Sequence, residues 1–356
     1  MSIKNLYADT LGDTQGPLDA AFTSMFDWRY QDERRDLLGL YAKGKQKQWD
    51  AEARIDWSQD IDHDNPQGVP EEVFPLYGSQ IWAKLTQAEK NTVRRHYQAW
   101  TVSQFLHGEQ GALLAASKIV QQVPDLEAKF YGATQVIDEA RHVETYKRLL
   151  EKFGISYTIA GPLDSLLKDV LTDSRWDMTY LGMQVVIEGL ALAAFSLSRD
   201  HSANPLIQAV NAYVMEDEAR HVAFGRLSLR DYYPELTQVE RNEREEFLVE
   251  ACYLMRDRFD GRQVWETLGL DAEACIEWQE HSQLMQLFRT QLFSRIVPVV
   301  KDVGLWGEKV QAAYADMGVL GFQDLDIRAL QNNDEQVAAD LDARRGYVDG
   351  VIEAAE

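Results

Sequence analysis

The sequence predicts an all-α protein whose core is a four-helix bundle, with additional helices before and after that core. Long stretches place apolar residues at helical spacing and lack the strict alternation of half-buried strands. Turn signals divide these stretches into two helical hairpins joined by a crossover. A six-residue motif occurs once in each hairpin. Apolar residues make up 45% of the 356 residues, which is enough to bury a large core.

Charge and cysteine content exclude several classes of function. The 36 Lys and Arg against 58 Asp and Glu give a formal net charge of −22, which should repel nucleic acids and anionic membrane surfaces. Cys252 and Cys275 are too few for a disulfide framework or a cysteine-based zinc site. The first residues show no cationic start followed by an apolar block, so we predict a cytoplasmic protein without a membrane partner.

The elements follow in order along the chain. Residues 1–86 contain many aromatic residues and turn signals and should form an ordered lead-in lying across the bundle. Residues 87–122 form the first long helix, which ends ahead of Pro124, and residues 125–153 form its partner, which ends at Gly154. A crossover through Gly161 and Pro162, with a short helix to residue 171, leads to the second hairpin.

The second hairpin consists of residues 174–200 and a partner helix that continues to residue 233. Residues 180–197 are apolar enough for a membrane span, but Gln184 and Glu188 lie within them, so Glu188 needs a cationic partner. Beyond this hairpin, residues 236–260 and 272–296 show helical spacing, and the acidic end after Gly321 should be partly mobile. We interpret residues 1–356 as one domain with a core at 87–233 and a helical extension at 234–356.

The repeated motif is the central observation. The string Asp138-Glu139-Ala140-Arg141-His142-Val143 recurs 79 residues later as Asp217-Glu218-Ala219-Arg220-His221-Val222. Glu109 and Glu188 are separated by the same 79 residues, so each half holds a Glu followed, 30 residues later, by an E-x-x-H pair. A Glu and a His at i and i+3 lie on one helix face, so each pair can address one metal ion.

The positions of these residues along the hairpins bring them to one level. Each of the four glutamates lies about 14 to 16 residues from the turn of its hairpin, so that at about 1.5 Å per residue they face each other at similar heights. Four carboxylates balance two divalent ions, and an oxygen-rich set without thiolates favours iron or manganese. The sequence therefore predicts a two-metal site with these ligands: Glu109, Glu139, His142, Glu188, Glu218 and His221.

With this motif, residues 87–233 resemble the ferritin-like di-iron carboxylate superfamily, in which two helices each give a Glu and two others each give Glu-x-x-His. The resemblance is to its O2-activating branch: multicomponent monooxygenases, acyl-carrier-protein desaturases, arylamine N-oxygenases and ribonucleotide reductase small subunits. It implies that Asp138 holds His221 and Asp217 holds His142, with Arg141 and Arg220 bracing those carboxylates. It also implies two Fe ions or a Mn/Fe pair, O2 as co-substrate and an external electron donor.

The resemblance further implies a small organic substrate, a reductase or ferredoxin partner, and allows a homodimer. Hydroxylation or N-oxygenation is the function we expect first. Desaturation, aldehyde deformylation, and a radical-generating role like that of a ribonucleotide reductase small subunit remain as alternatives. Val214 stands where arylamine N-oxygenases have an additional His four residues before the last Glu, and this difference argues against a close relationship with them.

Tyr146 follows His142 by four residues and so shares the metal-facing stripe. In reductase small subunits the radical Tyr stands at this interval, but desaturases also have Tyr in comparable positions, and we interpret Tyr146 as a buried packing or hydrogen-bonding residue. Its counterpart in the second half is Gly225, which we expect to leave room beside the site. Small residues such as Gly108 and Ala112 could likewise open a substrate cavity or only allow close helix packing.

Overall fold

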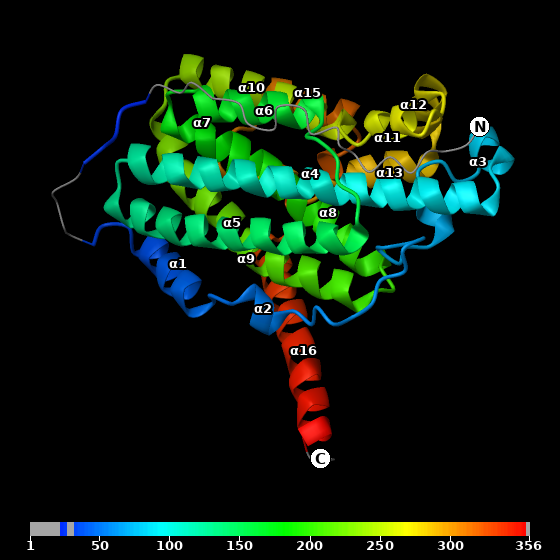
Figure 1. Cartoon of the computed structure of the whole chain (residues 1–356). Coiled ribbons are helices and arrows are strands. Elements are labelled where there is room, and N and C mark those ends of the chain that lie inside the picture. The colour runs from blue at the N-terminus through cyan, green and yellow to red at the C-terminus, as the bar shows by residue number, and fades with distance from the viewer. Residues whose placement is uncertain (1–21, 27–31, 354–356) are drawn as a thin grey trace.

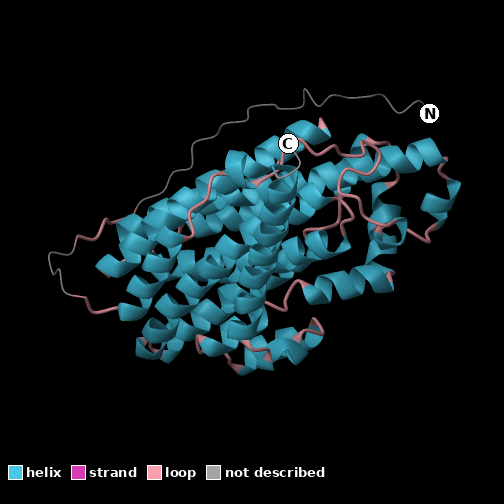
Figure 2. Ribbon diagram, turned by 90° about the horizontal axis from the view of Figure 1, so that it is seen from below, coloured by secondary structure: helices cyan, strands magenta, loops and turns pink. Residues whose placement is uncertain are grey.

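A computed structural model describes residues 22–26 and 32–353 of the chain. The regular elements of this described part are all helices, as the sequence predicts (Figures 1 and 2). They surround one continuous apolar core whose largest fully buried side chains include Trp100, Trp265 and Tyr131.

The first hairpin is formed by α4 (Gln87–Gln122) and α5 (Leu126–Phe153), which lie side by side along the bundle (Figure 1). Thr86 begins α4 with a capping box, in which Thr86 and Glu89 each bond the backbone N–H of the other. Gly154, at a φ of 68°, ends α5 in the left-handed conformation that glycine adopts without strain. Both predicted helices of this hairpin are therefore confirmed to within one residue.

The second hairpin is interrupted in its first arm. That arm runs through α7 (Trp176–Tyr180), a π-helical segment η2 (Leu181–Ile187) and α8 (Glu188–His201), and α9 (Pro205–Tyr232) is the second arm. The crossover contains α6 (Gly161–Thr172). The arm Trp176–His201 is long and apolar enough to cross a membrane, but 78% of its most apolar window is buried inside the fold. This arm is a core helix of the bundle.

The lead-in contains α1 (Arg35–Gln46), α2 (Ala51–Arg54), the short 3₁₀ turn η1 (Glu71–Val73) and α3 (Gln80–Lys84). Helix α1 packs against α5 and α9, at the side of the bundle away from α10 (Figure 1). The lead-in thus contacts both helices that carry the E-x-x-H pairs.

Further helices follow the bundle, and they have these bounds: η3 (Tyr233–Glu235), α10 (Gln238–Asp257), α11 (Arg262–Thr267), α12 (Ala272–His281), α13 (Gln283–Gln291), α14 (Ile296–Asp302), α15 (Glu308–Asp316), η4 (Leu320–Asp324) and α16 (Ile327–Glu353). Helix α16 forms most of the end after Gly321, which the sequence predicts to be partly mobile, and residues 354–356 of that end lie outside the described part. Helix α16 packs against α9. Its buried Asp334 accepts a hydrogen bond from Arg295 (2.8 Å), and its Ala338 is fully buried. Its C-terminal part then projects away from the bundle (Figure 1).

Candidate metal centre

Four helices bring the six predicted ligands together in the middle of the bundle. Helix α4 carries Glu109, α5 carries Glu139 and His142, and the other three residues come from the second hairpin, with Glu188 on α8 and with Glu218 and His221 on α9. Each of the six side chains is at most 5% exposed. Such burial of four carboxylates is costly unless cations balance them.

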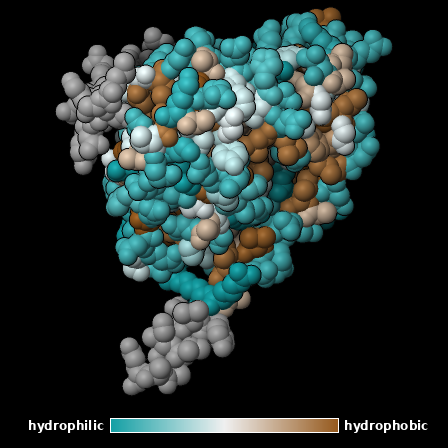
Figure 3. Space-filling view, turned by 90° about the vertical axis from the view of Figure 1, so that its right-hand side faces the viewer, coloured by the Kyte–Doolittle hydropathy of each residue, from teal (hydrophilic) through white to brown (hydrophobic). Residues whose placement is uncertain are grey.

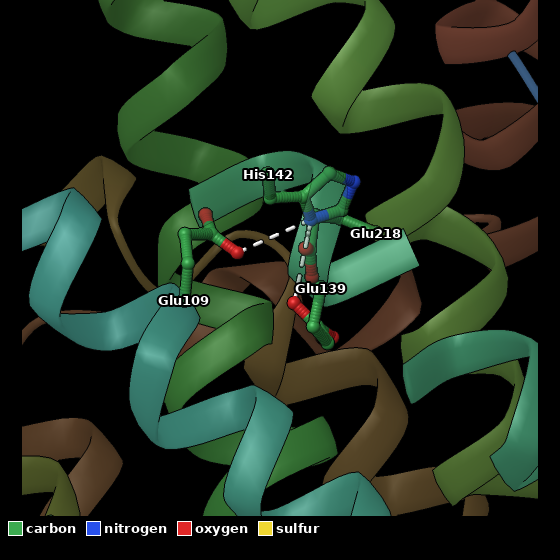
Figure 4. A group of neighbouring side chains, drawn as sticks. All are labelled: Glu109, Glu139, His142 and Glu218. Carbon is green, nitrogen blue, oxygen red and sulfur yellow. Dashed lines mark hydrogen bonds and ion pairs between the residues drawn. The ribbon is translucent and has the colours of Figure 1, made fainter. Parts of the chain in front are cut away.

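The nitrogen atoms that face the centre are the Nδ1 atoms of the two imidazoles. His142 Nδ1 lies 3.2 Å from Glu109, 3.3 Å from Glu139 and 3.0 Å from Glu218 (Figure 4). His221 Nδ1 lies 3.0 Å from Glu139 and 3.5 Å from Glu218. Both imidazoles therefore point into one cluster of carboxylate oxygens.

This cluster consists of two overlapping sets of possible ligands. One set is Glu109, Glu139, His142 and Glu218, and in the other Glu188 and His221 replace Glu109 and His142. Within each set the offered ligand atoms lie within 4.8 Å of one another. Glu139 and Glu218 belong to both sets, so each lies between the two possible metal positions. This differs from the sequence interpretation, in which each E-x-x-H pair addresses one ion. Two shared carboxylates with one terminal Glu and one His on each side form a dinuclear arrangement.

Several atoms of the cluster lack hydrogen bonds. Within the described part of the chain, both carboxylate oxygens of Glu218, one oxygen each of Glu139 and Glu188, and Nδ1 of His221 make none. Buried polar atoms are rarely left in this state unless an ion or water satisfies them. Their chemistry, carboxylate oxygen and imidazole nitrogen, is that of an iron or manganese site, so the residues present fit two such ions.

The opposite nitrogen of each imidazole bonds an aspartate from the other hairpin. His142 Nε2 donates to Asp217 (3.1 Å), and His221 Nε2 donates to Asp138 (3.2 Å). Arg141 bonds both aspartates, at 2.5 Å to Asp138 and 2.8 Å to Asp217. Arg220 also pairs with Asp217. The contacts implied by the resemblance are therefore present, and they fix Nδ1 as the atom free to bind a metal.

Two residues of the lead-in take part that sequence reasoning missed. Gln48 donates to Asp138 (2.7 Å), and Trp49 Nε1 donates to Asp217 (2.8 Å). Neither belongs to the internal repeat, so no spacing signal could identify them. Each aspartate behind an imidazole is thus also held from the N-terminal segment.

The π-helical segment ends at the residue before Glu188. A π-turn widens the helix locally, and such turns are frequent at functional sites. Gln135 of α5 donates to Glu139 (3.0 Å) and to Glu188 (2.9 Å), and Gln184 of the π segment lies next to it. Gln184 also fills the space beside Gly225: a Cβ at Gly225 would lie 2.5 Å from the Cβ of Gln184. The expectation that Gly225 leaves room beside the site was wrong.

Burial and neighbouring charges shift the pKa values of the cluster in opposite directions. Burial raises the pKa of Glu109 and of Glu188, and the nearby Glu218 raises both further. Burial also acts to raise the pKa of Glu139, but the charges of His221 and His142 lower it overall. The pKa of His142 is raised because its hydrogen bonds to Asp217 and Glu109 outweigh the effect of burial. The cluster thus attracts positive charge.

Tyr146 is fully buried and donates a hydrogen bond to Asn211 (3.2 Å). Burial raises its pKa, and the charges of Glu109 and Glu218 raise it further. Its ring contacts those of Phe105 and Phe195, with centroids 5.8 and 5.6 Å away. The phenol is therefore a neutral part of an aromatic wall beside the carboxylates.

Comparison with known proteins agrees with this geometry. Residues 31–304 match the model of the family described as P-aminobenzoate N-oxygenase AurF. A variant of an R2-like ligand-binding oxidase with an anaerobically reconstituted Mn/Fe cofactor is similar in fold, with a TM-score of 0.51 and 17% identity over 78% of this chain and 97% of the other. Another R2-like ligand-binding oxidase, with an aerobically reconstituted metal cofactor after photoconversion, has a TM-score of 0.44 and 19% identity over 73% and 94%.

The family match extends from the lead-in through the bundle to α14, well beyond the part of the chain that carries the repeated motif. It overturns the expectation, based on Val214, of distance from arylamine N-oxygenases. Val214 is fully buried on α9, so the chain has an apolar core residue at the position where the sequence analysis expects an additional His in arylamine N-oxygenases. The chain belongs to the P-aminobenzoate N-oxygenase AurF family, and it is an oxidoreductase.

Proposed function

We propose that the protein is a di-metal oxygenase that uses O2 to N-oxygenate or hydroxylate a small organic substrate. The observation that carries this proposal is the pair of overlapping ligand sets sharing Glu139 and Glu218. Glu109 with His142 and Glu188 with His221 would complete the two ends, and either two Fe ions or a Mn/Fe pair suits these donors. The family match favours N-oxygenation of an aromatic amine as the first reaction to test.

The protein residues would hold and orient the metals while the metals, when bound, supply the redox chemistry with O2. The four carboxylates balance the charge of two divalent ions, and Asp138 and Asp217 keep the imidazole Nδ1 atoms directed inward. The buried aromatic wall of Phe105, Tyr146 and Phe195 would exclude water from the centre. Electrons would come from an external reductase or ferredoxin in the cytoplasm, and a homodimer fits the proposal.

The first test measures metal content and oxygen transfer together. We expect about two Fe, or one Mn and one Fe, per chain by elemental analysis, and incorporation of labelled oxygen from ¹⁸O2 into an arylamine such as 4-aminobenzoate when reductant is supplied. Glu109→Ala and Glu188→Ala should each lower metal retention and abolish oxygen transfer at unchanged helix content. Glu144→Ala, which removes an exposed carboxylate from the same helix as Glu139, is the control and should behave as wild type.

The proposal fails if the replete protein holds one metal ion or none, or if both Glu variants retain wild-type oxygen transfer. If the protein binds two metals but forms no labelled product from any arylamine or aromatic substrate, it is a metal-binding protein and the oxygenase proposal is wrong.

A further inference from the structure

The inner cavity beside the metal ligands is too small for an organic substrate. It is lined among others by Gly108, Glu109, Ala112 and Glu188, and its volume of about 20 Å³ is room for about one water molecule. The small residues Gly108 and Ala112 therefore line a cavity but do not open a substrate-sized one. One aromatic side chain of its wall, Phe105, also lines a larger space, which we call the outer cleft.

The outer cleft has a volume of about 220 Å³ and opens between the lead-in, α4, α8 and α13. Figure 3 shows apolar side chains gathered around a hollow on this face. The apolar lining of the cleft includes these side chains: Val69, Phe74, Leu197, Phe259, Met285 and Phe288. An engineered protein cavity of about 150 Å³ binds benzene, so the outer cleft has room for one aromatic ring with a small substituent. Since Phe105 separates the two spaces, a ligand there would lie one ring away from the metal centre.

Within the described part of the chain, no acidic side chain and no Lys or Arg lines the outer cleft. Its one histidine, His201, is exposed and donates from Nδ1 to the backbone carbonyl of Leu197 (2.9 Å). Burial raises the pKa of the Tyr97 hydroxyl, and the nearby Asp260 raises it further, so this phenol stays neutral. An organic acid would therefore lose hydration in this cleft without gaining a cation, and the formal net charge of −22 would also repel it.

One buried polar atom of the outer cleft has no partner. Gln67 is 7% exposed, and among the described residues its Nε2 makes no hydrogen bond. The backbone of Gln67 is fixed, because its N–H donates to Gln98 (2.8 Å) and its carbonyl accepts from Ser202. Gln98 in turn donates from its own amide to Asn65 (2.8 Å), so it is occupied at both ends. A buried donor without a partner costs free energy, which an acceptor on a ligand would recover.

We propose that the outer cleft binds a neutral molecule with an apolar ring and one hydrogen-bond acceptor, and that Gln67 Nε2 donates to this acceptor. The role of this ligand as the substrate rests on the proposed function. The substrate then differs in charge from the aminobenzoate for which the family is named. Two features together give the selectivity: the uncharged wall disfavours an acid, and the unpaired amide disfavours a hydrocarbon.

The test compares three probes of similar shape in the ferrous protein without O2, where no turnover occurs. Acetophenone has a carbonyl acceptor, isopropenylbenzene has a CH2 group in place of that oxygen, and benzoate carries a charge. Calorimetry gives the Kd of each probe. In wild type we expect acetophenone to bind about 2-fold to 10-fold more tightly than isopropenylbenzene, the range for one neutral hydrogen bond. It should bind about ten-fold or more tightly than benzoate, which has no cation in the cleft.

Two variants locate the binding. Gln67→Met removes the donor at similar side-chain size, so it should weaken acetophenone to the level of isopropenylbenzene and leave the hydrocarbon unchanged. Gln283→Met, at an exposed position of α13 outside the cleft, is its control and should keep the preference. Leu197→Trp should fill the outer cleft and prevent binding of both neutral probes. Leu114→Trp, at an exposed position of α4, should bind them as wild type does.

Thermal unfolding without ligand separates this role of Gln67 from a structural one. Gln67→Met should unfold at an equal or higher temperature than wild type, because it removes a buried donor that has no acceptor in the described part. The proposal is wrong if acetophenone binds no more tightly than benzoate in wild type, if its preference over the hydrocarbon survives in Gln67→Met, or if both neutral probes still bind to Leu197→Trp. It is also wrong if Gln67→Met loses stability and both neutral probes alike. Because these measurements need no oxygen transfer, they can be read even if the oxygenase proposal fails.

Discussion

Each imidazole of the centre is held from behind by an aspartate of the opposite hairpin. His142 of α5 bonds Asp217 of α9, and His221 of α9 bonds Asp138 of α5. The same contacts that orient the ligands therefore also join the two hairpins. Because the donor nitrogen on one side of a ring is fixed, the other nitrogen is available to a metal.

Neutralising these aspartates should weaken the metal site without removing a ligand. We expect Asp138→Asn and Asp217→Asn each to lower metal affinity or activity by about 10-fold to 100-fold, and the double variant to lose more than either. Metal titration and product formation measure this loss. Asp169→Asn, at an exposed position of α6, should match wild type. Wild-type affinity in both single variants would show that the aspartates do not support the imidazoles.

Tyr146 distinguishes the oxygenase from a radical-storing protein. Since its hydroxyl bonds Asn211 and its ring belongs to the aromatic wall, Tyr146→Phe should keep most of the oxygenase activity and both metals. Paramagnetic resonance after O2 exposure provides the decisive comparison. A long-lived tyrosyl signal in wild type that disappears together with all activity in Tyr146→Phe would favour the radical-generating alternative.

His96 should make folding stability depend on pH. Burial lowers its pKa to about 4, with Arg95 adding to the effect, while the unfolded chain has the ordinary value near 6.5. Between these values the unfolded state binds more protons, so stability falls as the pH falls from 6.5 toward 4. From pH 6.5 to 5 this contribution should be about 1 to 2 kcal/mol. Urea unfolding should show it in wild type and in His201→Gln but not in His96→Gln, and an equal pH dependence in all three would contradict it.

At the scale of the elements, the π-helical segment between α7 and α8 sets the register of Glu188. It places Gln184 against Gly225 of α9 so closely that no side chain fits at residue 225. The contact joins the two arms of the second hairpin directly beside the ligands. A glycine here serves close packing and not substrate volume.

Gly225→Ala should therefore destabilise the protein by about 1 to 3 kcal/mol, as expected for overpacking a dense core. Denaturant unfolding measures the change. Gly39→Ala, on the exposed face of α1 with no atom near its added methyl group, should instead stabilise by about 0.5 to 1 kcal/mol. If Gly225→Ala unfolds with the free energy of wild type, the packing of η2 against α9 differs from this description.

At the scale of the whole molecule, the repeated motif made most of the fold predictable. Two hairpins with one ligand register require four helices to meet at one level, and the turns at Pro124 and Pro205 are local signals. The π-turn before Glu188 has no such signal, because the mostly apolar sequence of Leu181–Ile187 is equally compatible with a buried α-helix. Helix α16 is acidic, and it is ordered by tertiary contacts such as that of Asp334 with Arg295. Those contacts are not readable from composition.

The same limit applies to the ligand environment. The spacing of Glu and His predicts which side chains converge, but the sharing of Glu139 and Glu218 by both positions depends on helix rotation, which spacing leaves open.

The hydrogen bonds from the lead-in to the two aspartates have a thermodynamic consequence. Gln48 and Trp49 bond the residues that orient the imidazoles, and Glu216 of α9 pairs with Lys47 and Arg54 at 2.9 Å each. We therefore expect metal binding and docking of residues 35–54 on the bundle to favour each other, and linkage requires the two effects to have the same free energy. The lead-in should therefore report whether the metal site is occupied. Loading the metals should slow amide hydrogen exchange in α1. Trp49→Phe should reduce both this slowing and the affinity for the metals. Trp278→Phe, outside the lead-in, should change neither.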